Sequence, residues 1–232
     1  MLSWRMTSLT QLIASHGRIL VLDASSTRVQ VGVLRRDGPP VWQSSNDDAG
    51  RGLFAGTSAC LDAAGIEIDA VGAFVFCEGP GSMLGIRTTA MAIRIWQVLR
   101  PRPVFRYSSL ILLAHHLARS DHGPFSVIAD ARRDTWHVVG VQAGAVSPLR
   151  RVPSAELGTS GERLVRPAAF RAWSPPPRAA TDCPYDVAAL FEAEKDAALL
   201  AATDAPDGFQ SEPSSYRKWS AQVHSLDSVA RR

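Results

Sequence analysis

One polar turn and one glycine-rich loop contain the residues whose types and spacing could bind a phosphate group, and a second polar turn could contact a partner. The first turn, residues 23–27, follows an apolar run and places an acidic side chain before three hydroxyl side chains. Such a turn can hold nucleotide phosphates, with its carboxylate near a bound metal ion. A plain hairpin turn has the same composition, and the turn taken alone favours that simpler interpretation. Its candidate residues are Asp23, Ser25, Ser26 and Thr27.

The glycine-rich loop, GPGSMLGIR at residues 79–87, is the sharpest motif in the chain. Glycines beside a helix N-terminus can bind an anion through backbone N–H groups. The loop lacks the Gly-Lys-Ser/Thr ending of a P-loop and the glycine spacing of a dinucleotide fingerprint. Spacing alone favours a tight strand-to-helix turn in which the serine caps the helix. Its candidate residues are Gly79, Gly81, Ser82, Gly85 and Arg87.

The second polar turn, DARRD at residues 130–134, carries charge at the end of an expected strand. Its candidate residues Asp130, Arg132 and Arg133 could contact a partner or simply be solvated in a turn. The local sequence favours the solvated turn.

No catalytic pattern accompanies these motifs. His115 and His116 project about 100° apart on a helix, unlike the i and i+4 pair of a helical metal site. The chain has no Gly-x-Ser-x-Gly elbow, and no cysteine stands beside an obvious base. We therefore expect no catalytic residue, no metal site and no cofactor.

Apolar periodicity predicts the elements that position the first turn and the glycine-rich loop. Strands are expected at residues 18–23, 28–34 and 41–45, which places the first turn in a hairpin. Helices are expected at 51–64, 84–99 and 110–119, with strands at 71–77 and 104–107 between them. Gly65 ends the first helix, and Ser108 or Ser109 caps the third.

The second half repeats the theme of the first. Residues 121–124 break the pattern, and strands at 125–130 and 135–142 again flank a polar turn. Two such halves predict an α/β protein with a duplicated actin-like, ribonuclease-H-like fold of two subdomains. The expected division is a leader at 1–17, an N-terminal subdomain at 18–120, and a shortened C-terminal subdomain at 121–232. The last of these contains a helix at 187–202 and a loose tail.

Composition excludes several classes of protein. The chain has 232 residues, 46% of them hydrophobic, but no uninterrupted apolar run long enough to span a membrane. Its N-terminus lacks the pattern of a secretory signal, and its three cysteines lack metal-ligand spacing. These features predict a cytoplasmic protein. A net charge of +3 without a run of basic residues predicts weak binding to nucleic acid by the chain alone.

Five segments, taken in order, resemble the TsaB (YeaZ) family, the tRNA threonylcarbamoyladenosine biosynthesis protein TsaB. They are ILVLDASST, GPGSMLGIR, the Ser-Ser-Leu helix start at 108–110, Asp-Ala-Arg-Arg at 130–133, and PSSYR at 213–217. The resemblance implies the duplicated actin-like fold. It also implies a non-catalytic partner of a TsaD-like catalytic subunit, which helps to recruit a TsaE-like ATPase. Such a protein contacts tRNA only through the complex and can form a homodimer.

The resemblance also implies that helices of the first subdomain form the partner surface. The helix at 84–99 has apolar residues all round, more than a single sheet needs to cover it. The surplus predicts an exposed apolar patch, unless the helix at 110–119 covers it within the chain. The expected partner residues are Leu53, Phe54, Leu61, Leu84, Thr88, Met91 and Ile95.

Two other functions compete with the partner role. A small-molecule kinase of the same fold would use Asp23 and the glycine-rich loop to hold ATP, but no second acidic residue is placed as a base. A metallopeptidase, suggested by the glycoprotease label of some family members, would need the helical histidine pair that is missing. Both are disfavoured.

Overall fold

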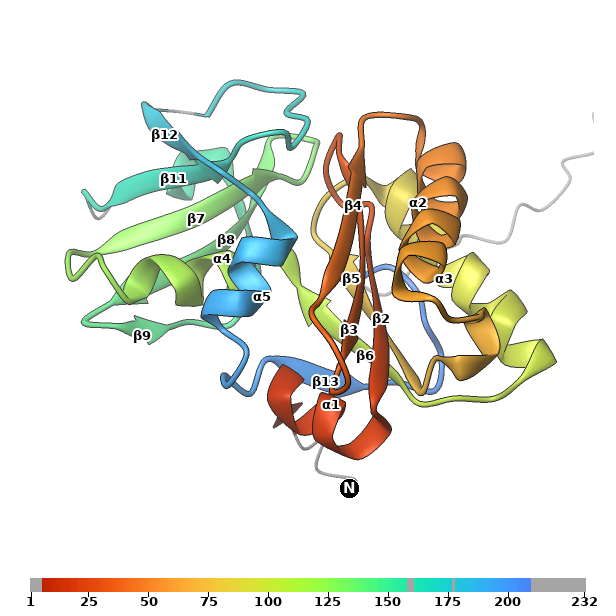
Figure 1. The fold of residues 1–232 in the computed structure, drawn as a ribbon. Helices are drawn as coiled ribbons and strands as arrows, with labels where there is room; N and C mark the ends of the chain where they lie inside the picture. Colours follow the sequence, from red (N-terminus) through yellow and green to blue (C-terminus); the bar gives the residue numbers. More distant parts are fainter. Residues whose placement is uncertain (1–5, 158–160, 177, 210–232) are drawn as a thin grey trace, which may run out of the picture.

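The structure is a computed structural model that describes residues 6–157, 161–176 and 178–209. Two mixed β-sheets stand side by side, with helices between them and on one outer face (Figure 1). Apart from β1 and β13 of the first sheet, the strands of each sheet come from one of the two halves seen in the sequence.

The first sheet has seven strands in the order β1-β13-β6-β5-β2-β3-β4. At the centre of this sheet, β5 pairs parallel with both β2 and β6. Strand β3 pairs antiparallel with both β2 and β4. The β2–β3 hairpin carries the first turn, and β5 ends at the glycine-rich loop. The strands are β1 Met6–Thr7, β2 Arg18–Asp23, β3 Val29–Arg35, β4 Val41–Ser45, β5 Ala73–Gly79, β6 Val104–Ser108 and β13 Leu200–Ala202.

The second sheet has the order β10-β8-β7-β11-β12, with the short β9 paired to β8. Strands β7, β11 and β12 are parallel, so their carboxyl ends lie at the same edge. The β7–β8 hairpin carries the second polar turn at this edge. The strands are β7 Phe125–Asp130, β8 Thr135–Gln142, β9 Ala145–Val146, β10 Arg150–Pro153, β11 Arg163–Pro167 and β12 Ala180–Cys183.

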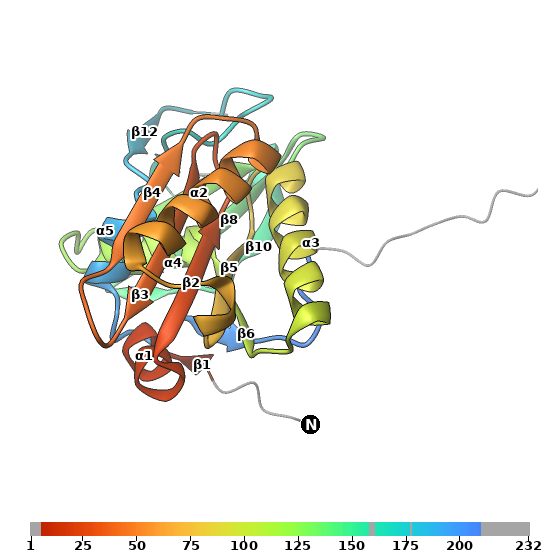
Figure 2. The same cartoon turned by 45° about the vertical axis from the view of Figure 1, so that its right-hand side comes forward.

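Helices cover both faces of the first sheet. Figure 2 shows α2 (Ala49–Ala64) and α3 (Met83–Leu99) on the face turned away from the second sheet. Helices α4 (Ser109–Ala118) and α5 (Val187–Ala193) lie on the other face, towards the second sheet. Side chains alternate between these faces along β2: Leu20 and Leu22 join the core under α2 and α3, whereas Ile19 joins the core around α4.

The helix ends follow the chemistry of their caps. Asp48, Ser82 and Ser108 each accept a backbone N–H of the first turn of α2, α3 and α4, respectively. Gly65 ends α2 in the left-handed conformation that favours glycine. Ser82, Ser108 and Gly65 are caps expected from the sequence, whereas α2 begins two residues before its expected start at Arg51.

The expected leader is wrong for the residues that the structure describes. Residues 6–7 pair as β1 with β13, and α1 (Leu9–His16) follows directly. Leu9 and Leu12 of α1 are buried in the core around α4. The fold therefore begins before Arg18. Ser8 and Gln11 form a capping box at the start of α1, and this pair is a helix-start signal visible in the sequence.

The helix expected at residues 187–202 is also wrong in its length. Helix α5 ends at Ala193, and residues 200–202 form β13, which pairs antiparallel with β6 of the first sheet. The chain thus returns to the first sheet after building the second. The expected C-terminal subdomain is therefore not one contiguous segment. Two short 3₁₀ turns, Ile68–Ala70 and Ser154–Glu156, complete the elements.

Two sequence expectations concern the ends of the chain. The PSSYR segment at 213–217 and the loose tail lie outside the described residues. Among the described residues, no helix is both long and apolar enough to cross a membrane.

Candidate site at the subdomain cleft and the exposed face of α3

Asp23 is fully buried at the end of β2, where its carboxylate accepts four hydrogen bonds. One oxygen accepts the backbone N–H and the hydroxyl of Ser25, at 2.8 and 2.7 Å. The other accepts the hydroxyls of Tyr107 and Tyr185, at 2.5 and 2.8 Å. Two oxygens with about four lone-pair sites are then filled by the protein itself. The carboxylate has little capacity left for a metal ion.

The two tyrosines remain donors over the ordinary pH range. Burial, followed by the nearby charge of Asp23, raises the pKa of Tyr107 and of Tyr185 well above the usual value. Burial also raises the pKa of the neighbouring Cys77 thiol. Tyr185 follows β12, so it carries this network from the second sheet into the end of β2.

The hydroxyl groups of the first turn bind the local backbone. Ser26 Oγ donates to the carbonyl of Arg28 at 2.8 Å and accepts the N–H of the same residue at 3.0 Å. Thr27 donates its backbone N–H to the carbonyl of Ala169, in the loop after β11. This geometry matches the hairpin-turn interpretation of residues 23–27.

The glycine-rich loop packs directly against the first turn. A Cβ atom at Gly81 would lie 2.2 Å from the carbonyl oxygen of Ser25, and one at Gly85 would lie 2.0 Å from that of Ala24. Ser82 donates its backbone N–H to the Ser25 carbonyl at 2.6 Å. The two candidate phosphate loops therefore meet backbone to backbone, and the glycines permit that approach.

A cavity of about 550 Å³ opens beside this contact. It unites Ser25, Ser26, Thr27 and Ser82 of the two loops, whereas Gly79, Gly81, Gly85 and the exposed Arg87 are not among its lining residues. Of its carboxylates, Asp47 accepts the hydroxyl of Ser45 and Asp48 caps α2. The other lining residues are Ala24, Val29, Asn46, Ala49, Leu84 and Arg171.

The second polar turn is held by Asp130. One carboxylate oxygen accepts the backbone N–H of Arg132 at 2.6 Å, and the other accepts those of Trp173 and Ser174 at 2.7 and 2.8 Å. Arg132 and Arg133 are exposed, and their φ angles are positive. Sequence reasoning missed Trp173, because nothing in its own loop points to residue 130.

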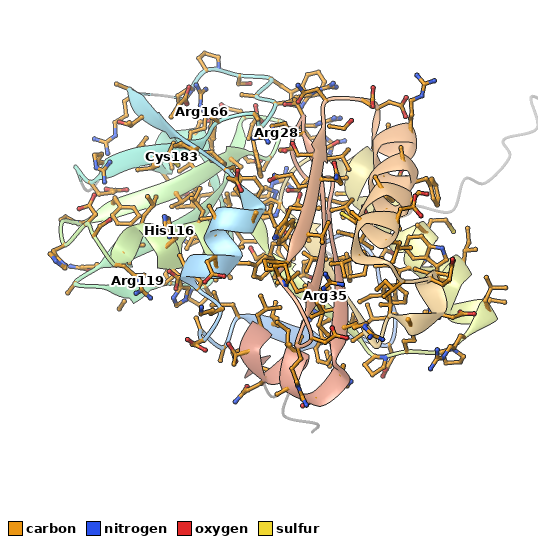
Figure 3. The ribbon with its side chains drawn as sticks, in the orientation of Figure 1. Arg28, Arg35, His116, Arg119, Arg166 and Cys183 are labelled. Atoms are coloured by element: carbon orange, nitrogen blue, oxygen red, sulfur yellow. The ribbon has the colours of Figure 1, made fainter. Side chains whose placement is uncertain are left out.

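The described residues contain no group of three or more histidine, cysteine or acidic side chains that could hold a metal ion. His115 and His116 are each partly buried on α4, and His116 Nδ1 lies 3.8 Å from the buried Glu194 carboxylate. Figure 3 shows His116 beside Arg119, whose guanidinium reaches the same carboxylate at 3.7 Å. This group ties α4 to the end of α5.

The α3 helix exposes an apolar surface, here called the α3 face. Its members are between 41% and 85% exposed: Phe54, Met83, Leu84, Met91, Ile95, Val98 and Leu99. Thr88 lies on the same helix and is partly buried. The alternative in which the helix at 110–119 covers the surplus is wrong, because α4 packs on the opposite face of the sheet. Phe54 joins the α3 face edge-on to Trp96, at 6.2 Å between ring centroids.

Two of the expected partner residues do not lie on this surface. Leu53 is 0% exposed and Leu61 is 9% exposed, and both belong to the core under α2. They lie on the stripe of α2 that packs against the sheet, whereas Phe54 lies on the outer stripe. The expectation for Leu53 and Leu61 is therefore corrected.

Comparison with known proteins identifies the fold. Neither a protein-family profile nor a curated protein matches the sequence. The structure is similar to YeaZ from Pseudomonas aeruginosa, with a TM-score of 0.58 and 20% identity over 76% of this chain and 90% of that one. It is also similar to an uncharacterized protein with similarity to peptidase YeaZ from the same species, with a TM-score of 0.57 and 21% identity over 77% and 91%. The predicted α/β fold is confirmed, and with it the resemblance to YeaZ at the level of the fold.

Proposed function

We propose that this chain is a cytoplasmic, non-catalytic partner of a TsaD-like catalytic subunit in the threonylcarbamoyladenosine modification of tRNA. The exposed apolar α3 face carries this proposal. Soluble monomers rarely leave a large contiguous apolar surface in water, so a surface of this kind marks a site of association. In the proposed complex the α3 face contacts the TsaD-like subunit, a TsaE-like ATPase joins the assembly, and a homodimer uses the same face when the partner is absent.

The first turn supports a role without catalysis. Its carboxylate is occupied by Ser25 and by two tyrosine hydroxyls, so a kinase that used Asp23 to hold a metal–ATP complex would first have to break these bonds. The same carboxylate serves the folded state instead. No observation on the described residues favours the kinase or the metallopeptidase, and the proposal includes no cofactor.

Co-purification with a TsaD-like protein from the same host tests the proposal. Met91→Glu places a charge in the middle of the α3 face, where burial against a partner would desolvate it at a cost of several kcal/mol. We expect this variant to lose the partner and to become a folded monomer. Met6→Glu makes the same change at a similarly exposed methionine on β1 and should leave association unchanged.

The result that overturns the proposal is equally specific. If light scattering finds a monomer and the TsaD-like protein also fails to bind, the α3 face is not an association surface. If the Met91→Glu variant binds the TsaD-like subunit and a second copy of the chain as the parent does, the association surface lies outside the α3 face. Stoichiometric ATP binding tighter than roughly 10 μM by calorimetry, about −7 kcal/mol, would contradict the non-catalytic role.

A further inference from the structure

The loops that follow β7 and β11 carry three exposed arginines and one exposed tryptophan, here called the arginine–tryptophan cluster. It consists of Arg132, Arg133, Arg171 and Trp173. The two arginines of the turn follow β7, and the other two residues follow β11, its parallel neighbour. Loops at the carboxyl ends of parallel strands are the usual place for ligand contacts in α/β sheets.

The cluster is built before any ligand arrives. The Asp130 carboxylate binds backbone N–H groups of both loops, so one side chain sets the distance between Arg132 and Trp173. The Arg132 guanidinium lies over the Trp173 ring, 4.7 Å from its centroid. Trp173 is nevertheless 63% exposed. A rigid aromatic ring backed by a cation therefore faces solvent, with little ordering left to do on binding.

The charges of the cluster are available to a ligand. Arg132, Arg133 and Arg171 are exposed and form no ion pair with another described residue. Arg171 also lines the 550 Å³ cavity beside residues 25–27. Asp134 is the acidic neighbour on the same turn, and the charge of Asp130 is engaged by three backbone N–H groups.

We infer that this cluster binds single-stranded nucleic acid, with a base stacked on Trp173 and phosphate groups held by the arginines. Guanidinium groups suit phosphate, and an exposed indole suits the face of an unpaired base. Tryptophan and arginine are also frequent at protein interfaces, but several arginines without acidic partners favour a polyanion. The choice of RNA over DNA rests on the proposed function, whereas the stacking site does not.

The sequence pattern concealed this site. The two arginines of the turn and the residues of the later loop are far apart in the chain, so neither segment forms a basic run. Only the contacts of Asp130 bring them together. Few charges take part, which agrees with weak binding by the chain alone, in the range of about 1–100 μM for non-specific nucleic-acid binding at physiological salt.

Fluorescence anisotropy of a labelled single-stranded RNA of about 12 nucleotides tests the inference on the full chain. We expect binding at 50 mM salt that weakens steeply as salt rises. Trp173→Ala should weaken binding about tenfold, as expected for the loss of one stacked base, and Trp173→Phe should restore part of it. Arg133→Ala should lower the slope of log K against log salt by roughly 0.7.

Arg36→Ala is the matched control, because it removes one exposed positive charge. Arg36 follows the carboxyl end of β3, whereas the first turn precedes the amino end of that strand. It should leave both the affinity and the salt slope unchanged. The inference is overturned if the parent does not bind RNA, if Trp173→Ala binds as the parent does, if duplex RNA binds as tightly, or if an acidic peptide displaces the RNA at equal concentration.

The same variants separate this inference from the proposed function. RNA binding is measured without the TsaD-like subunit, so a failure of subunit pairing leaves it intact. Trp173→Ala should still pair with that subunit through the α3 face. A variant with full pairing and weakened RNA binding supports both statements, and the thermal unfolding of each variant shows that it is folded.

Discussion

At the scale of single residues, the clearest result is that a carboxylate placed like a phosphate-site residue works as a structural anchor. Asp23 gathers hydrogen bonds from Ser25, Tyr107 and Tyr185 inside the core. A buried charge is tolerated only when donors replace the water it has lost. The sequence predicted an acidic residue at the end of β2. Its role as a hydrogen-bond acceptor for two tyrosines could not be predicted, because those tyrosines come from distant parts of the chain.

Asp23→Ala should lower the free energy of unfolding by about 3 kcal/mol or more, because it leaves two tyrosine hydroxyls buried without an acceptor. Denaturation in urea measures the loss. Adding Tyr107→Phe and Tyr185→Phe should recover part of it, since the unsatisfied donors are then removed as well. A loss below 1 kcal/mol for the alanine variant would show that the network contributes little.

His137 predicts a pH dependence of stability. Burial, followed by the charge of Arg151, lowers the pKa of this imidazole to about 4 in the folded chain, whereas an unfolded histidine titrates near 6.5. Between these values only the unfolded state takes up the proton. The contribution of neutral His137 to the free energy of unfolding is therefore fully present above pH 6.5. It declines as the pH falls and is lost below about pH 4.

His137→Phe should remove this dependence. The free energy of unfolding of the parent, measured relative to that of the variant, should fall by about 1–2 kcal/mol from pH 7.5 to pH 5. Urea titrations at both pH values measure it. The pKa argument for His137 fails if the two proteins keep the same difference at both pH values.

At the scale of elements, most strands and the three main helices could be predicted because their signals are local. The strands at 18–23 and 125–130 are apolar runs, and the helix from Met83 has its serine cap in the sequence. The strand at 200–202 could not be predicted, because its alanine- and leucine-rich sequence suits a helix and only pairing with β6 makes it a strand.

The contact between α3 and the first turn predicts opposite outcomes for two glycine-to-alanine variants. Gly85→Ala would force a Cβ to within 2.0 Å of a backbone carbonyl, so it should lower the free energy of unfolding by about 2 kcal/mol. Gly50→Ala, in the first turn of α2, meets only a side-chain oxygen at 3.4 Å and should stabilise the chain by about 0.5–1 kcal/mol. Chemical denaturation of both variants checks the pair. If Gly85→Ala is as stable as the parent, the contact between α3 and the first turn can shift to accept the added Cβ atom at little cost.

At the scale of the whole molecule, the two subdomains share one core. The cluster around α4 includes Val75 of the first sheet and Val127 of the second. Gln30 adds a hydrogen-bonded link between them, since its amide donates to the carbonyl of Tyr185 and accepts the N–H of Val187. The sequence predicted two subdomains, but it could not show that they are packed together, because the shared contacts are long-range.

A shared core predicts that the chain unfolds as one cooperative unit. Calorimetry should record a single transition whose van't Hoff enthalpy equals the calorimetric enthalpy. Gln30→Leu should lower the midpoint, because it leaves a buried carbonyl and N–H unsatisfied, and should keep a single transition. Two separate transitions in the parent would show that the subdomains are independent.

The return of β13 to the first sheet has a consequence for the order in which the molecule is made. Strand β13 lies between β1 and β6, so residues 6–7 have no neighbour in the sheet until residues 200–202 have been synthesised. Strand β1 can therefore join the sheet only after β13 has been synthesised. During synthesis β6 remains an open edge, available to another extended chain, and the arrival of three residues closes it.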